Sequence, residues 1–251
     1  QSRGLGDVYK RQIEYRTNWG EEVKLAGLST ESTPMYTTDG IYWTAEVELE
    51  VPQEGLTIHY SYQIEQNGIV IRKEWNNFPR CLFLSGTPRK KYRINDCWKN
   101  IPEQLYLYSS AFTEALLSHP ERVDIPQGYK KGLIIKAYAP RINKDYCLAI
   151  CGNQKALGNW DPEKAVLMSD FNFPEWQVEL DASKLKYPLE YKFILCHKQE
   201  RKIDCWEKNP NRYLADPEIK TNETLVISDR YVYFDIPMWK GAGTVSYTHL
   251  R

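Results

Sequence analysis

The chain has 251 residues, enough for one or two domains, and carries 33 basic and 33 acidic side chains. This balance provides no net field that would attract nucleic acid or an anionic membrane, so neither partner is expected and the ligand should be uncharged. Eight Trp and 18 Tyr supply many flat amphipathic rings, and no apolar run is long enough for a membrane span.

Both ends of the chain look foreign to a fold. Residues 1–12 and 245–251 resemble translated sequencing-adaptor read-through of the kind found at the ends of fragmentary genes. We therefore expect residues 1–12 to lie outside the folded part. We also expect the natural protein to extend beyond both ends.

Residues 13–98 have the pattern of short strands. Within them, residues 43–51 alternate apolar and charged side chains, as a half-buried strand does. About seven strands recur at roughly ten-residue intervals, separated by clusters of Gly, Pro, Asn and Asp. This spacing predicts an antiparallel β-sandwich.

Residues 99–130 are expected to form a linker with one short helix. Ala111, Phe112, Ala115 and Leu116 fall on one helical face. We expect this helix to dock on a neighbouring module as a spacer.

Residues 131–241 predict a second sandwich, with two tryptophans on its turns. Trp160 stands between Gly-Asn and Asp-Pro, and Trp206 precedes Asn-Pro-Asn, where turn chemistry rather than core packing dominates. An exposed indole can stack on the C–H face of a sugar ring while nearby donors bind its hydroxyls. Lys192, in a strand between the two, could supply such a donor.

The alternative interpretation is that these rings are packed in a core. A tryptophan is more often structural than functional, and Trp176 begins an alternating run to residue 180 that predicts a strand with a buried face. The same possibility stays open for Trp160 and Trp206 until their exposure is known.

The second half repeats the first. Residues 23–27 match residues 148–152, and Trp75 and Trp206 are each followed by a proline four positions later. These matches predict two tandem copies of one module, and hence an all-β chain of two antiparallel sandwiches.

The first copy lacks most of the candidate site. Ser61 stands where the second copy has Lys192, and no tryptophan replaces Trp160. Trp75 remains, and with Trp43 it could form a weak site. We expect the first copy to bind weakly or to act as a spacer.

The six cysteines, at 81, 97, 147, 151, 196 and 205, show no Cys-x-x-Cys spacing, which argues against a zinc site. Cys196 and Cys205 could face each other across a hairpin, but free cytosolic thiols are the stronger expectation. The sequence thus predicts a cytoplasmic protein without metal or other cofactor.

The turn, strand and loop motifs of the second half resemble the starch-binding carbohydrate-binding module of family twenty. The resemblance implies an immunoglobulin-like fold with one glucan site at Trp160, Lys192, Trp206 and Asn211. The first copy has Arg80 in place of the asparagine.

The family's second site is matched less well. Trp176 fits its tryptophan, and Phe171 lies near the expected place of a flanking tyrosine. The resemblance thus implies a second site at these two residues.

The order of motifs over residues 13–244 resembles the amino-terminal half of the cytosolic disproportionating 4-α-glucanotransferases. The motifs are Asn-Trp-Gly at 18–20, Ser-Ala-Phe at 110–112 and the exit segment 236–243. In that family the exit segment leads into an amylomaltase-type catalytic barrel, which is absent here. Residues 242–251 would then be the start of the lost catalytic region plus read-through.

The resemblance implies a region that binds starch, glycogen or maltooligosaccharide and positions the glucan for a C-terminal catalytic domain of the same protein. No catalytic residue is expected in this chain, because its acids lie on the polar faces of strands or in turns. A non-enzymatic glycogen- or starch-binding scaffold or regulatory module is the alternative. A structural or adhesion pair, with Trp160 and Trp206 buried, is the third possibility.

Overall fold

A computed structural model describes residues 7–75, 79–87, 89–100, 128–139, 142, 145–200, 202–229, 232 and 234. We call residues 7–100 the first half and residues 128–234 the second half. The predicted linker helix at 111–116 and the exit segment 236–243 lie outside the described residues. Within the described part, no helix is long and apolar enough to cross a membrane.

The described residues are all-β, as expected, and form three sheets. The largest sheet contains, in spatial order, β12 (Ser169–Asn172), β13 (Glu175–Asp181), β9 (Lys131–Tyr138), β17 (Glu223–Asp229), β8 (Lys91–Cys97), β1 (Asp7–Glu14) and β4 (Tyr42–Leu49).

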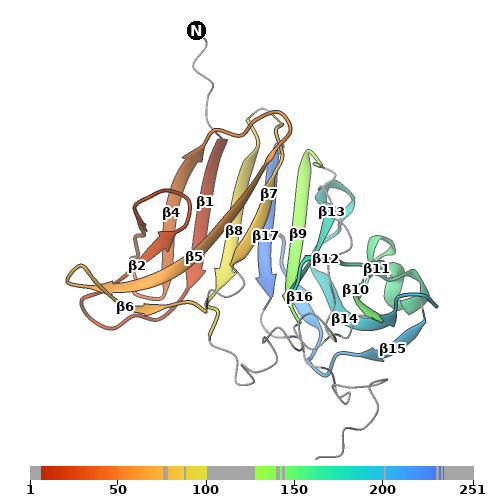
Figure 1. The fold of residues 1–251 in the computed structure, drawn as a ribbon. Helices are drawn as coiled ribbons and strands as arrows, with labels where there is room; N and C mark the ends of the chain where they lie inside the picture. The colour runs from red at the N-terminus through yellow and green to blue at the C-terminus, as the bar shows by residue number, and fades with distance from the viewer. Residues whose placement is uncertain are drawn as a thin grey trace, which may run out of the picture.

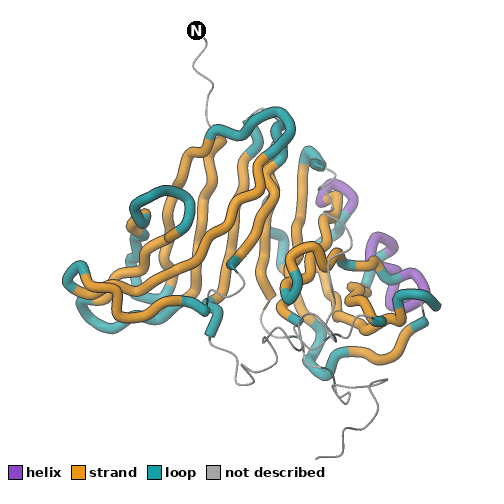
Figure 2. Tube along the Cα trace, in the orientation of Figure 1, coloured by secondary structure: helices purple, strands orange, loops and turns teal. Residues whose placement is uncertain are grey.

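Each half adds a smaller sheet of its own. In the first half it contains β3 (Thr33–Pro34), β2 (Glu21–Ala26), β5 (Leu56–Gln66), β6 (Ile69–Lys73) and β7 (Arg80–Leu84). In the second half it contains β11 (Val166–Leu167), β10 (Tyr146–Gly152), β14 (Leu189–His197), β15 (Ile203–Trp206) and β16 (Arg212–Leu214). Short 3-10 turns, η2 (Lys155–Trp160), η3 (Pro162–Lys164) and η4 (Ala182–Lys184), lie in the second half (Figure 2).

The largest sheet runs through both halves (Figure 1). At its centre β17 of the second half pairs in parallel with β8 of the first half, and β9 and β1 continue the parallel set on either side. The carboxyl ends of these four strands therefore lie at one edge of the sheet. This arrangement differs from the expected pair of self-contained sandwiches, because the halves share a sheet.

The two central strands of the second half are buried on both faces. Ile134 of β9 and Val226 of β17 pack into the core of the first half. Leu133 and Leu225 point the opposite way and pack into the core of the second half. Burial on both faces accounts for the nearly continuous apolar sequence of these strands.

Part of the segment expected to lie outside the fold belongs to it. Residues 7–12 pair as β1 with β4 and β8, and Tyr9 and Arg11 are fully buried. The Arg11 guanidinium lies 3.9 Å from the centroid of the Tyr60 ring. Successive side chains of a strand point to opposite faces, so Tyr9, Arg11 and Ile13 share the inner face of β1.

The two halves repeat one hydrogen-bond pattern. The Glu74 N–H donates to the Tyr62 carbonyl at 3.0 Å, and the Glu207 N–H donates to the Phe193 carbonyl at 3.0 Å. In each half a side-chain oxygen of the glutamate accepts the N–H of the same partner in return. Glu74 therefore corresponds to Glu207.

At Trp206 this register differs by two residues from the sequence comparison. Gln63 pairs with Lys73 as Ile194 pairs with Trp206, so Lys73 occupies the place of Trp206 in the first half. Trp75 does not, and its ring is only 7% exposed. The register is set by which residues pair across the hairpin, and the sequence match could not reveal this pairing.

Arg80, which the sequence comparison paired with Asn211, is a buried structural residue. Its guanidinium binds Glu74 at 2.7 Å, just as Arg212 binds Glu207 at 2.9 Å. Arg80 therefore corresponds to Arg212.

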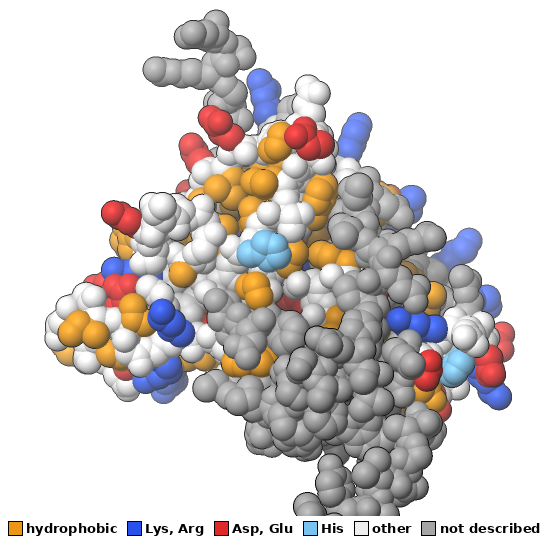
Figure 3. Space-filling view, in the orientation of Figure 1, with side chains coloured by type: hydrophobic (Ala, Val, Ile, Leu, Met, Phe, Trp, Pro, Cys, Tyr) orange, Lys and Arg blue, Asp and Glu red, His pale blue; other side chains and the backbone are white. Residues whose placement is uncertain are grey.

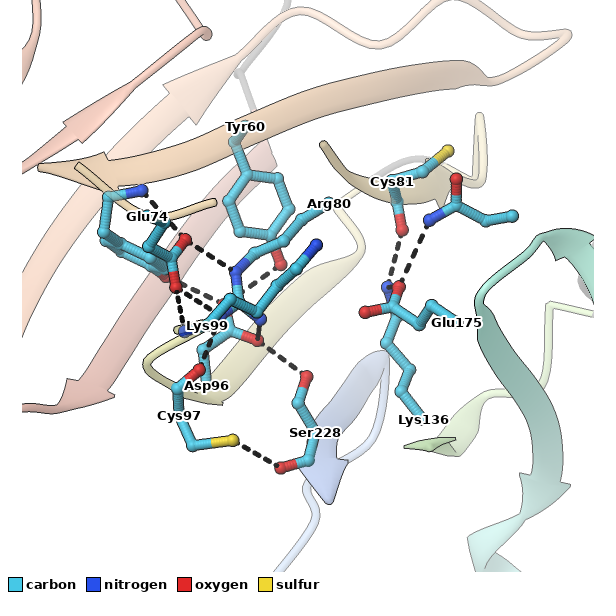
Figure 4. Close-up of polar contacts among 12 residues, drawn as sticks. Tyr60, Glu74, Arg80, Cys81, Asp96, Cys97, Lys99, Lys136, Glu175 and Ser228 are labelled. Atoms are coloured by element: carbon cyan, nitrogen blue, oxygen red, sulfur yellow. Dashed lines mark hydrogen bonds and ion pairs between the residues drawn. The ribbon is translucent and has the colours of Figure 1, made fainter. Parts of the chain in front are cut away.

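A buried polar cluster links the two halves (Figure 4). The Ser228 hydroxyl of β17 donates to Asp96 of β8 at 2.7 Å. Lys136 of β9 donates to Glu175 at 2.8 Å and to the Cys81 carbonyl of β7 at 2.5 Å. Removing one partner of such a bond leaves a buried group uncompensated, so the cluster fixes how the halves meet.

Candidate functional site

Trp160 and Trp206 lie side by side on the second half. Their ring centroids are 6.2 Å apart, and the ring planes are inclined at 46°. Trp160 ends η2 and Trp206 ends β15, and both residues are half-buried. Neither residue is fully buried, and Trp206 packs against the core of the second half.

The turn that presents Trp160 uses an uncommon backbone. Gly158, Asn159 and Trp160 have φ values of 83°, 53° and 61°. A bulky L-residue in this left-handed region costs about 1–2 kcal/mol, and such strain is concentrated at functional positions. Leu157 anchors the turn in the core, and the Asp161 N–H closes it on the Gly158 carbonyl at 2.9 Å.

The hairpin that presents Trp206 is held by a buried acid. Trp206 pairs with Ile194 of β14, and the next residue, Glu207, is 2% exposed. Glu207 accepts the Phe193 N–H at 2.8 Å and an Arg212 N–H at 2.9 Å. Burial raises the pKa of the Glu207 carboxyl, and these donors act against that rise. Glu207 and Trp206 are consecutive, so their side chains lie on opposite faces, and Trp206 is half-buried against the core of the second half.

Lys192 lies beside this hairpin. It is half-buried on β14, and its Nζ donates to the Glu207 carbonyl at 3.4 Å. Asn211 is exposed in the loop that leads from Glu207 into β16. The structure thus brings Lys192 next to the segment that carries Trp206, and it places Asn211 at the other end of the same loop.

The arrangement offers apolar ring faces with an ammonium donor at their side. It is suited to binding a ligand with flat C–H faces and hydroxyl groups. Among the residues that the structure describes, no group of three or more His, Cys, Asp and Glu side chains is placed to hold a metal ion.

The candidate second site on Trp176 is not compatible with its position. Trp176 is 0% exposed, its Nε1 donates to the Ala139 carbonyl at 3.2 Å, and Phe173 packs edge-on against it. A ring without an exposed face cannot stack on a sugar. Phe171 is half-buried on β12, and the buried Trp176 cannot form a sugar platform together with it.

The candidate weak site of the first half is also a core feature. Trp43 is 6% exposed and Trp75 is 7% exposed. Trp43 pairs with Ile13 on the shared sheet and packs in the core of the first half. Neither ring can serve as a platform in this arrangement.

Other aromatic residues of the first half are exposed instead. Trp19 is 100% exposed, Tyr36 is 71% exposed and Tyr42 is 46% exposed. Trp19 stands between Asn18 and Gly20, which is the same turn signal that singled out Trp160. That signal could have identified Trp19 as a surface residue from the sequence.

The cysteines, all of which are described, form no disulfide. Cys196 pairs across the sheet with Cys147 on one side and Ile203 on the other, whereas Cys205 opposes Leu195. Cys196 and Cys205 are therefore not directly opposite each other. Burial raises the pKa of the Cys196 thiol to about 11, so this thiol is a poor nucleophile at neutral pH.

Figure 3 shows one face of the molecule. Basic and acidic side chains are interspersed around its rim, with apolar side chains between them. On the part of this face that the structure describes, such mixing fits the balanced composition.

Comparison with known proteins identifies one family match. The family profile described as "Starch binding domain", of carbohydrate-binding module family 20, matches residues 135–226. This segment begins in β9, ends in β17 and contains Trp160, Lys192, Trp206 and Asn211. No curated protein matches the chain.

Three solved structures are similar to parts of the chain. The family 20 module of a maltotetraose-forming amylase from Pseudomonas saccharophila has 17% identity and a TM-score of 0.32, covering 39% of this chain and 99% of the module. A family 15 glucoamylase from Hypocrea jecorina has 21% identity and a TM-score of 0.33, covering 45% of this chain. A γ-cyclodextrin glucanotransferase (γ-CGTase) from the alkalophilic Bacillus clarkii has 13% identity and a TM-score of 0.30, covering 91% of this chain. The chain spans 19% of the glucoamylase and 28% of the γ-CGTase.

Proposed function

We propose that the second half binds α-1,4-glucans, such as starch, glycogen or maltooligosaccharides, through Trp160 and Trp206. The two indoles stack on successive glucose rings, and Lys192 and Asn211 bind ring hydroxyls. The starch binding domain match over residues 135–226 supports this ligand class.

The observation that carries the proposal is the pair of tilted, half-buried rings 6.2 Å apart, one of them held at positive φ. Two inclined platforms can contact two neighbouring units of a bent sugar chain. Two stacks, each worth ~1–3 kcal/mol by analogy with aromatic stacking on nucleic-acid bases, lead to a dissociation constant between about millimolar and tens of micromolar.

We further propose that the first half is a second, degenerate copy of the same module. The matched bonds of Glu74 and Glu207 support a common origin. Lys73 in the place of Trp206 and Ser61 in the place of Lys192 leave this copy without the stacking pair. It therefore acts mainly as a spacer.

The wider setting of the chain is also a proposal. The order of motifs supports the amino-terminal, glucan-binding region of a cytoplasmic 4-α-glucanotransferase, which positions glucan for a catalytic domain beyond residue 244. Reading the coding sequence past this residue tests the idea. A catalytic (β/α)-barrel sequence would support it, whereas a different continuation would favour a non-enzymatic glycogen- or starch-binding scaffold.

The glucan site is tested by titration calorimetry of the full chain with β-cyclodextrin and maltoheptaose. Trp160→Ala and Trp206→Ala should each weaken binding about tenfold or more, because each removes one of two stacking platforms. The melting temperature should change little, because both rings are partly exposed.

Trp19→Ala is the matched control, since it removes a fully exposed indole from the other half. It should leave the affinity for β-cyclodextrin unchanged. Equal losses in all three variants would show that binding to exposed indoles is unspecific. Unchanged binding in Trp160→Ala and Trp206→Ala would refute the proposal.

A further inference from the structure

A cavity of about 690 Å³ lies where the two halves meet. It is at the carboxyl edge of the parallel strands β1, β8, β17 and β9. Their last residues, Glu14, Cys97, Asp229 and Tyr138, all line it. Its size falls within the range of about 300–1,000 Å³ that is usual for small-molecule sites. None of the predicted glucan-site residues is among the described lining residues.

The cavity has aromatic walls from both halves. Tyr15 and Trp98 of the first half form a tilted pair with ring centroids 4.4 Å apart. Tyr42 of the first half is 46% exposed, and Tyr138 comes from β9 of the second half. Rings on several sides of one cavity can enclose the apolar faces of a flat, amphipathic ligand.

The polar lining carries both signs of charge. Its described basic and acidic members are Arg16, Arg80, Lys99, Lys136, Glu14, Glu175 and Asp229.

Two of the basic members are already engaged in ion pairs: Arg80 binds Glu74, and Lys136 binds Glu175. A lining so nearly balanced gives an anion little net attraction. A neutral polyhydroxyl ligand fits better, because each hydroxyl can donate to a carboxylate and accept from an ammonium or guanidinium group.

We propose that this junction cavity is a second saccharide site, which binds one to three neutral sugar units between the halves. The inference shares the ligand class of the proposed function but none of its residues. Because Tyr15 and Trp98 come from one half and Tyr138 and Asp229 from the other, a bound sugar contacts both halves at once.

The test uses the full chain with Trp160→Ala and Trp206→Ala combined, so that the first site is removed. Maltotriose is titrated by calorimetry, and two-dimensional NMR follows the indole N–H signals, with that of Trp98 identified through Trp98→Phe. The double variant should retain one binding event that shifts the Trp98 signal. Adding Tyr15→Ala or Tyr138→Ala should weaken this event about tenfold.

Tyr36→Ala, which removes an exposed tyrosine outside the cavity, should leave the residual binding intact. Tyr15→Phe keeps the ring and should also bind, so it separates loss of stacking from loss of folding in Tyr15→Ala. Glucose 1-phosphate and inorganic phosphate form the anion arm. Tighter binding of both than of maltotriose would overturn the neutral ligand class.

The outcomes separate the two proposals. If wild type binds maltotriose and the double variant does not, the junction site is refuted and the tryptophan site stands. If wild type and the double variant bind maltotriose equally and the Trp98 signal shifts, the junction site is supported and the tryptophan site is refuted. Residual binding that shifts other indole signals but leaves that of Trp98 in place would also refute the junction site.

Discussion

At the scale of single residues, the proposed glucan site depends on how far each tryptophan is exposed rather than on how many tryptophans there are. Trp160 and Trp206 are half-buried, whereas Trp43 and Trp176 are buried in the cores of the two halves. A stacked ring replaces weakly held water over its whole face, but a hydrogen bond to a sugar hydroxyl replaces one already made to water. The tryptophans should therefore supply most of the affinity.

This contrast yields a prediction for Lys192. Lys192→Ala should weaken β-cyclodextrin binding by about 0.5–1.5 kcal/mol, the net value of one hydrogen bond, and thus less than Trp206→Ala does. Calorimetry of the two variants under one set of conditions measures the difference. Lys192→Arg retains a donor and should recover part of the loss. A larger effect from Lys192→Ala than from Trp206→Ala would mean that polar contacts dominate.

The junction cavity yields a prediction about pH. Burial, together with the positive charges of Arg80 and Lys136, lowers the pKa of Lys99 to about 8 from 10.5. Between pH 8 and 10.5 the unfolded chain binds more protons at this residue than the folded chain, so Lys99 makes stability rise with pH across that window. Below it both states are protonated, and the cost of burying the ammonium is present in full.

Lys99→Met should remove this rise in the free energy of unfolding. Urea unfolding gives the free energy of unfolding of wild type and variant at each pH across this window. The difference between the two free energies should change with pH, because the titrating groups that both proteins share cancel in it. Lys91→Met, which removes an exposed lysine from the start of β8, should run parallel to wild type. A Lys99→Met curve that is also parallel to wild type would contradict the expected proton release.

At the scale of elements, the turn η2 determines whether Trp160 can act. Gly158 has φ of 83°, and a Cβ added there would lie 2.8 Å from the Lys164 carbonyl oxygen. Gly158→Ala should therefore lower the free energy of unfolding by more than the ~1–2 kcal/mol of left-handed strain, and it should weaken glucan binding by displacing Trp160.

Gly68→Ala provides the matched control. Gly68 has a similar φ of 76°, but a Cβ added there would meet nothing within 4 Å. It should show the strain without the clash and should leave glucan binding unchanged. Thermal unfolding and β-cyclodextrin titration of both variants measure these effects. Equal destabilisation with equal binding would show that the contact with Lys164 is unimportant.

At the scale of the whole molecule, the shared sheet predicts one unfolding transition. Ile134 belongs to the second half but is packed in the core of the first, whereas its neighbour Ile135 is packed in the core of the second. Ile134→Ala and Ile135→Ala should each cost about 2–5 kcal/mol and lower the same calorimetric transition. Two transitions, of which each variant shifts only one, would mean that the halves unfold independently.

The sequence by itself determined the all-β class, because alternation and turn residues act locally. It also determined that Trp160 stands in a turn, since Gly, Asn and Pro beside it limit the backbone, whereas Trp206 is the last residue of β15. The matches between the two halves were visible in the same way, although the match at Trp206 was off by two residues. The match between Trp75 and Trp206 failed because letter similarity does not reveal which residues pair across two strands.

Only the tertiary structure decided which rings are buried and how the halves join. Burial depends on what packs over a strand, so the alternation around Trp43 and Trp176 predicted a buried face but not which side of the strand would be covered. The pairing of β8 with β17 connects residues more than 120 positions apart, as the bond from Ser228 to Asp96 illustrates. No local pattern encodes such a contact, so the shared sheet and the cavity at its edge emerge only when the chain is folded.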